Sequence, residues 1–278
     1  MNNGGEIIVS VQSRQDAVIN GSGTIGTGKY DDVRISGSGR ILGDIFCHEV
    51  KVSGSAKFNG KVETEYFNCS GSAKCLSDVD AKKMSVSGSA SIDGKVSGGD
   101  VNVSGSFKTK GDLNVKSINV SGSMKTTGIV KAEVITVKGS LSTEKGSECE
   151  VFTAKGHLSM NGLLNAENVK ITHGGFGYLP HNGFSYIPEI GGETIEISRF
   201  DDNNIFARLF SKLFNNRLNF KADVIEGSAV KIDYTTASVV RGDAVTIGPK
   251  CVIELVEYTE DVQIHPSAKV TDVKKLEQ

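Results

Sequence analysis

Residues 84–100 read MSVSGSASIDGKVSGGD, and residues 101–117 read VNVSGSFKTKGDLNVKS, so one 17-residue unit is followed directly by a second. The unit continues in both directions without a gap. Its first positions recur at this constant spacing and are Val33, Val50, Phe67, Met84, Val101, Ile118, Ile135, Phe152 and Val169. Self-similarity at a fixed period indicates a solenoid, in which near-identical coils stack on one another. Such a rod offers flat faces and two ends for interaction.

Residue types alternate along the unit. Positions 1, 3, 7, 9, 13 and 15 are apolar or small, and even positions are mostly Ser, Lys, Asp, Asn and Glu. Alternation with period two is a strand pattern, because successive strand side chains point to opposite faces. Glycine recurs at positions 5 and 11, as at Gly105 and Gly111, where it allows positive φ and close backbone approach at a corner. The unit therefore predicts three short strands and three corners.

Stacking such units predicts an all-β fold, a parallel β-helix with coils about 4.8 Å apart and a dry, narrow interior. The composition agrees, with 33 Gly, 4 Pro and no Trp. Left-handed helices built from hexapeptides prefer a period of 18, so the period of 17 favours the right-handed form.

Composition and charge restrict the possible settings. The chain has 278 residues and a net charge of −2, so no bulk attraction to nucleic acid is expected. Residues 1–10 are polar and lack the features of a signal peptide, and no apolar run is long enough to span a bilayer. We therefore expect a cytoplasmic protein, with the inner face of the membrane as a further location.

Four segments follow from the pattern. Residues 1–16 are expected to form a polar leader, 17–173 the β-helix, 174–217 an insert, and 218–278 further irregular coils and a polar tail. The insert is expected to hold an amphipathic helix near 204–215. Its apolar stripe is expected to pack on the solenoid, or alternatively to meet a membrane or a partner; the stripe is Ile205, Phe206, Leu209, Phe210, Leu213 and Phe214.

Residues for catalysis or metal binding do not form a constellation in this sequence. Asp31 and Asp32 are adjacent and face opposite sides of a strand. His157 and His173 could lie on neighbouring coils, but they lack Cys or carboxylate partners at ligand spacing. We therefore predict no enzymatic activity, no cofactor and no metal.

The tandem V-x-V-S-G-S-x-x-x-x-G-x-V units resemble the bactofilins, a family of polymer-forming bacterial cytoskeletal proteins. With residues 239–248, VVRGDAVTIG, and the 208–217 segment, the chain is similar to the longer bactofilin-like proteins of Gram-positive bacteria. The resemblance implies a right-handed parallel β-helix and end-to-end assembly without nucleotide. It also implies roles in cell shape, the envelope or flagellar assembly and motility, and no catalytic residues to carry over.

The ends of the stack are the expected site of self-assembly, because an uncapped β edge can add another chain. The expected N-terminal surface is Val33, Ile35, Ile41 and Ile45. The expected C-terminal surface is Cys251, Ile253, Val256 and Tyr258. The expected partners are further copies of the chain, a paralogous bactofilin, a membrane surface, or envelope or flagellar proteins. The alternative function is a β-helix binding module or adhesin that acts through its flat faces.

Overall fold

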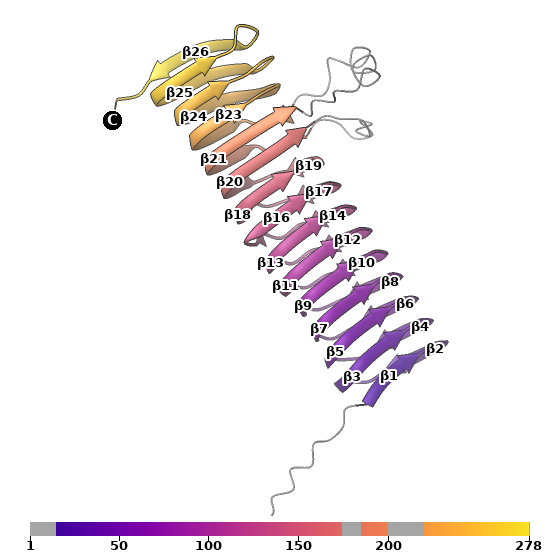
Figure 1. Ribbon diagram of the computed structural model, residues 1–278. Coiled ribbons are helices and arrows are strands. Elements are labelled where there is room, and N and C mark those ends of the chain that lie inside the picture. Colours follow the sequence, from indigo (N-terminus) through magenta and orange to yellow (C-terminus); the bar gives the residue numbers. More distant parts are fainter. Residues whose placement is uncertain (1–14, 174–184, 200–219, 278) are drawn as a thin grey trace, which may run out of the picture.

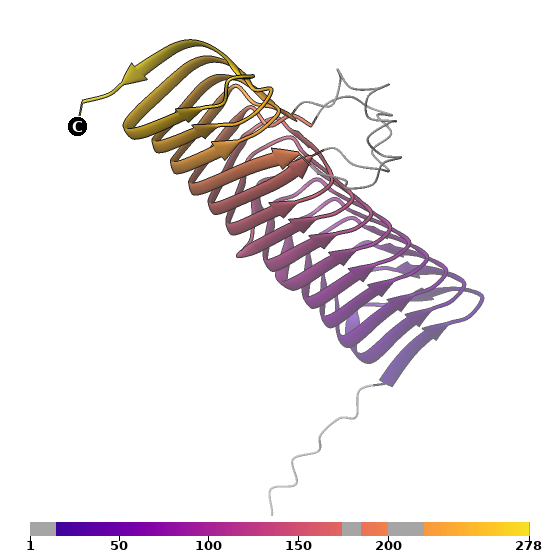
Figure 2. The same cartoon turned by 45° about the horizontal axis from the view of Figure 1, so that its top comes forward.

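A computed structural model describes residues 15–173, 185–199 and 220–277. Within these ranges the chain forms only strands, connecting turns and bends, without a helix. Figures 1 and 2 show the strands of successive coils side by side along one rod, with β1 and β26 at opposite ends. The predicted parallel β-solenoid is confirmed.

Most regular coils combine one long strand and one short strand. The long strands are β3 (Gly28–Ile35), β5 (Ile45–Val52), β7 (Val62–Cys69), β9 (Val79–Val86), β11 (Val96–Val103), β13 (Leu113–Val120) and β18 (Ser147–Ala154). The short strands are β2 (Ser22–Ile25), β4 (Ser38–Ile41), β6 (Ser55–Phe58), β8 (Ser72–Cys75), β10 (Ser89–Ile92), β12 (Ser106–Thr109), β14 (Ser123–Thr126), β17 (Ser140–Thr143) and β19 (His157–Met160).

The other strands lie at the two ends or in less regular coils. They are β1 (Gln15–Ile19), β15 (Val130–Lys131), β16 (Val134–Val137), β20 (Leu163–His173), β21 (Glu189–Arg199), β22 (Phe220–Lys221), β23 (Val224–Ile232), β24 (Thr235–Ile247), β25 (Val252–Ile264) and β26 (Lys269–Lys275). All pairings between strands are parallel, and most join residues that are one sequence repeat apart, as in β11 and β13. The sequence repeat is therefore the coil itself.

Each regular coil holds two strands instead of the expected three. The long strand runs through the third corner, which shows as a change of phase in burial: Leu113 and Val115 are buried, and then Ile118 and Val120. In one regular coil the long strand is divided into two separate strands, β15 and β16. Hydrogen bonding thus continues past this bend, and the strand count falls by one.

The interior matches the predicted inward positions. Its largest fully buried side chains include Phe58, Phe67, Phe107 and Phe152. One column of the interior is polar, however: Thr109, Thr126 and Thr143 stack in register and are buried. This column is still an inward one, because threonine has nearly the shape of valine and packs in the same space.

The corner glycines serve the close approach that glycine allows, and they do not use its freedom to adopt a positive φ. Among the described glycines, only Gly98 has a positive φ, at 126°. A Cβ on Gly105 would lie 2.0 Å from the carbonyl oxygen of Gly88, the same corner of the preceding coil. That oxygen accepts a hydrogen bond from Ser106 N at 2.9 Å. The hydrogen bond between corners therefore leaves no room for a side chain.

The stack continues through part of the expected insert. β21 pairs with β20 on one side and with β23 on the other, so residues 189–199 form a strand of the solenoid. The two internal gaps in the described chain follow His173 and Arg199, which are register partners at the same corner. The predicted helix near 204–215 lies outside the described residues and stays a prediction.

One of the C-terminal coils, between β23 and β24, is shorter than the regular coils, and two later corners have a different backbone conformation. Val224 pairs with Val239, a shorter interval along the chain than the one that joins Val96 to Leu113 in the regular coils. Two of the later corners hold residues with positive φ that are not glycine, Tyr234 at 48° and Lys250 at 60°. A positive φ at a residue other than glycine places local strain at these two corners.

Candidate functional site

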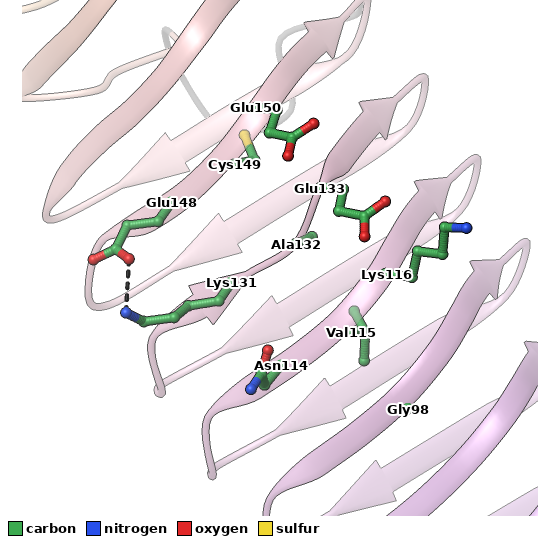
Figure 3. A pocket seen from close by; sticks show the side chains of 10 residues that line it. All are labelled: Gly98, Asn114, Val115, Lys116, Lys131, Ala132, Glu133, Glu148, Cys149 and Glu150. Atoms are coloured by element: carbon green, nitrogen blue, oxygen red, sulfur yellow. Dashed lines mark ion pairs between the residues drawn. The ribbon is translucent and has the colours of Figure 1, made fainter.

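A shallow hollow lies on the side of the rod where β15 and β16 are separated (Figure 3). Its volume is about 520 Å³, and its lining residues include Lys116, Lys131, Glu133, Glu148 and Cys149. Lys131 Nζ lies 2.7 Å from Glu148 Oε2. The hollow is the outer side of the third corner, where the strand is interrupted.

The side chains of this hollow offer no activated nucleophile. Burial raises the pKa of the Cys149 thiol to about 12, so the thiol stays protonated at neutral pH and is a poor nucleophile. The Glu148 carboxylate forms an ion pair with Lys131. No group of three or more His, Cys, Asp or Glu side chains among the described residues could hold a metal ion. The hollow therefore supports no assigned chemistry.

The N-terminal end of the described stack is the coil formed by β1 and β2. β1 pairs only with β3, and β2 only with β4, within the described chain. The inward positions of this coil hold few large side chains. Ala17 and Gly23 are half-buried, and Ile19 and Ile25 are 7% exposed. This edge therefore presents backbone groups over a thin apolar layer.

The C-terminal end is the coil formed by the end of β25 and by β26. β26 pairs only with β25 among the described strands. Ile264 continues the buried column of Ile247, and Val273 continues that of Val256, yet they are 40% and 41% exposed. Among the described residues, no further coil lies above these two side chains, which occupy interior positions. This end is an open strand edge with an exposed apolar layer.

The residues expected to mediate self-assembly lie one coil inside these ends. Val33, Ile35 and Ile41 are fully or almost fully buried, and their register partners Ala17, Ile19 and Ile25 belong to the outer coil. Ile45 is also buried and pairs with Gly28.

At the other end, Cys251, Ile253 and Val256 are buried beneath β26, and Tyr258 is half-buried with Lys275 Nζ 6.0 Å from its ring centre. The sequence reasoning missed β26 because Lys269–Lys275 alternates weakly and is rich in charge. The signal that could have located this last described coil was the alternation of Val262 with Ile264 and the pair Val270 and Val273.

The apolar face expected at 205–214 lies outside the described residues. In the part of the chain that the structure describes, no helix is long and apolar enough to cross a membrane.

Comparison with known proteins identifies a relationship in the N-terminal third of the chain. A family model described as bactofilin, polymer-forming cytoskeletal, matches residues 1–97. The match confirms the resemblance seen in the repeat. It covers the coils as far as β11, and the later coils lie beyond it.

Two uncharacterized proteins of Bacillus subtilis strain 168 are similar to parts of the chain. YhbF is 40% identical over 88 residues, which is 32% of this chain and 34% of YhbF. YhbE is 47% identical over 55 residues, which is 20% of this chain and 23% of YhbE. The chain thus matches about a third and about a quarter of the length of these relatives. No solved structure matches the chain.

Proposed function

We propose that this chain is a non-enzymatic scaffold of the bactofilin type, which self-assembles end to end through its terminal coils without nucleotide. The observation that carries the proposal is the C-terminal end, where Ile264 and Val273 stand exposed in the interior columns above the last buried coil. The match to a polymer-forming cytoskeletal family supports it.

The physical driving force is the same as that of the stack itself. An exposed strand edge carries unpaired N–H and C=O groups and can add another strand, while the apolar layer beneath it gains burial. Hydrogen bonds and apolar contacts provide this affinity directly, so the assembly has no step that requires a nucleotide. By the family resemblance, the resulting polymer would organise cell shape, the envelope or flagellar assembly at the inner face of the membrane.

The first experiment charges the C-terminal end without touching the core. Ile264→Lys combined with Val273→Lys should shorten the polymers seen by light scattering and electron microscopy, because stacking would bury two unpaired charges. The matched control is Val134→Lys with Leu163→Lys, two side chains that are similarly exposed (39% and 44%) in the middle of the rod. The control should assemble normally, and circular dichroism should be unchanged in both variants.

A second variant distinguishes head-to-tail stacking from meetings of like ends. Gly21 lies at the same corner as Gly37 of the next coil. A Cβ added to Gly37 would lie 1.9 Å from the Gly21 carbonyl oxygen. A Cβ on Gly21 itself would meet nothing within 4 Å. Gly21→Ala should therefore fold normally but block a coil that stacks in register on this edge. Shorter polymers would indicate head-to-tail growth, and unchanged polymers would indicate that like ends meet.

A wild-type chain that stays monomeric at high concentration in light scattering would contradict the polymer proposal. That result would favour the alternative, a binding module that acts through the flat faces of the rod.

A further inference from the structure

One coil near the middle of the rod departs from the regular repeat in its strands. It lies between β13 and β18, beside the hollow, and its long strand is divided into β15 and β16 (Figure 3). The inward repeat position at this break is also less well covered. Ala132 and Cys149 are half-buried there, whereas Val115 and Ala166, on the two flanking coils, are 6% and 3% exposed. The wall of the solenoid is therefore loosened on one side.

Two buried hydroxyl groups flank the corner that follows this break. Thr143 is 1% exposed and Ser147 is fully buried, and neither hydroxyl has a hydrogen-bond partner among the described residues. The threonine of the preceding coil differs, because Thr126 Oγ1 accepts a hydrogen bond from Gly128 N at 3.1 Å. A buried hydroxyl without a hydrogen bond destabilises the folded state, since it has lost its bonds to water.

Ser147 also leaves its interior column short of apolar contact. Its register partners on the two neighbouring coils are Val130 and Leu164, which are both buried. The other regular coils hold only Val, Ile or Leu at this repeat position. A serine buries less apolar surface and makes fewer van der Waals contacts than these residues. Stacking is therefore weaker on both sides of Ser147.

The corner between the two hydroxyls is packed differently from the regular corners. Lys145 stands at the repeat position where the preceding coils carry Gly111 and Gly128. A Cβ on Gly128 would lie 2.2 Å from the carbonyl oxygen of Gly111, in the preceding coil. A Cβ on Gly146 would instead come nearest to the carbonyl oxygen of Leu163, in the following coil, at 2.8 Å. The close approach of stacked glycines is thus interrupted here.

We propose that the coil of residues 128–146 is a weak joint, at which the stack opens or bends first. In a solenoid each coil contacts only its neighbours, so the stability is close to a sum of coil and interface contributions. A poorly joined coil then opens locally while the rest of the chain stays folded. The coils before it, as far as β14, and those from β18 onward form two stable segments on either side.

The weak joint belongs to the single chain and does not depend on self-assembly. Opening there would separate the pairings of β16 with β13 and β18, and those of β17 with β14 and β19. A polymer built from such rods would bend at one point in each chain, while the two stable segments stay straight.

The test is hydrogen exchange of the full chain at neutral pH, read by mass spectrometry of peptides. We compare the paired amides of β16 and β17 with those of β11 and β12, which occupy the same repeat positions two coils earlier. Both sets lie in parallel pairings, so opening must precede exchange. We expect exchange about ten-fold faster or more at β16 and β17, because the unpaired hydroxyls make opening easier there.

Two variants remove the hydroxyls and keep nearly the same side-chain volume. Thr143→Val and Ser147→Ala should each slow exchange at β16 and β17 about ten-fold, because the folded coil no longer buries that unpaired group. The matched control is Thr126→Val, in the same interior column one coil earlier. It removes the acceptor of Gly128 N, so it should not slow exchange in its own coil or at the joint.

Equal exchange of the two strand sets in the wild type would overturn the proposal. So would Thr143→Val and Ser147→Ala variants that both exchange as fast as the wild type or faster. That result would mean that the hydroxyls are satisfied in the folded chain, for example by an internal water. Circular dichroism checks that each variant is folded, and light scattering records its assembly. A monomeric chain with the expected exchange pattern would contradict the polymer proposal and support the weak joint.

Discussion

The regular coils between Val33 and His173 and the later coils from Phe220 onward close the same cross-section with different corners. In the regular coils, a glycine such as Gly105 passes beneath the carbonyl of the preceding corner. In the later coils, Tyr234 and Lys250 turn the chain with positive φ, and the coil between β23 and β24 has fewer residues than a regular coil. The difference shows that corners can vary while the inward columns stay in register.

The inward columns should therefore respond alike in both regions. Val103 and Ile247 are each 1% exposed and face the interior. Val103→Asp and Ile247→Asp should each lower the free energy of unfolding by about 3–5 kcal/mol, because each buries an unpaired charge. Thermal and urea unfolding would measure this. Asn102→Asp and Thr246→Asp, one residue earlier on the outer side, should change stability little.

An equal loss of stability in the inward and outward variants would contradict the alternation of side chains. A large loss at Val103 with a small one at Ile247 would mean that the later coils are loosely packed.

A corner glycine of the regular coils should not tolerate a side chain, whereas a glycine without a close backbone neighbour should. Gly105→Ala should lower the free energy of unfolding by about 1–3 kcal/mol, because its Cβ would overlap the Gly88 carbonyl oxygen. Gly191→Ala in β21 is the control, since its Cβ would meet only side-chain atoms at 3.4 and 3.9 Å. There we expect the free energy of unfolding to rise by up to about 1 kcal/mol, because alanine lowers the conformational entropy of the unfolded chain. Similar losses at both positions would argue against the close-approach explanation.

The smallest effect is expected at the strained corner of the later coils. Lys250→Gly should raise the free energy of unfolding by up to about 1 kcal/mol, because glycine adopts a φ of 60° without strain. Lys95→Gly, at an exposed corner of the regular coils without positive φ, should lower stability by about 0.5–1 kcal/mol. Urea unfolding at one temperature would compare the two. If both variants lost stability, the stabilising contacts of the Lys250 side chain would outweigh the strain of its positive φ.

The sequence alone determined the coil, its period and its inward face. A constant repeat with alternating apolar positions allows few other arrangements, since one coil cannot bury its own interior and must stack on the next. The predicted inward positions of the regular repeats are buried in the described residues, apart from Ala132 and Cys149, which are half-buried, and Gly98, which is exposed. The bactofilin resemblance also followed from the repeat, and the family match over residues 1–97 confirmed it.

Only the tertiary structure decided where the stack ends and what its corners require. Short, charged β26 has little intrinsic strand signal, and it pairs because β25 offers it an edge. The buried position of Val33 and Val256 depends on such neighbours, which lie outside any single repeat. Likewise, Arg40, Lys57 and Lys74 belong to three successive repeats and lie side by side only because their strands pair in parallel. Local pattern specifies which way a side chain points, and stacking specifies what lies above it.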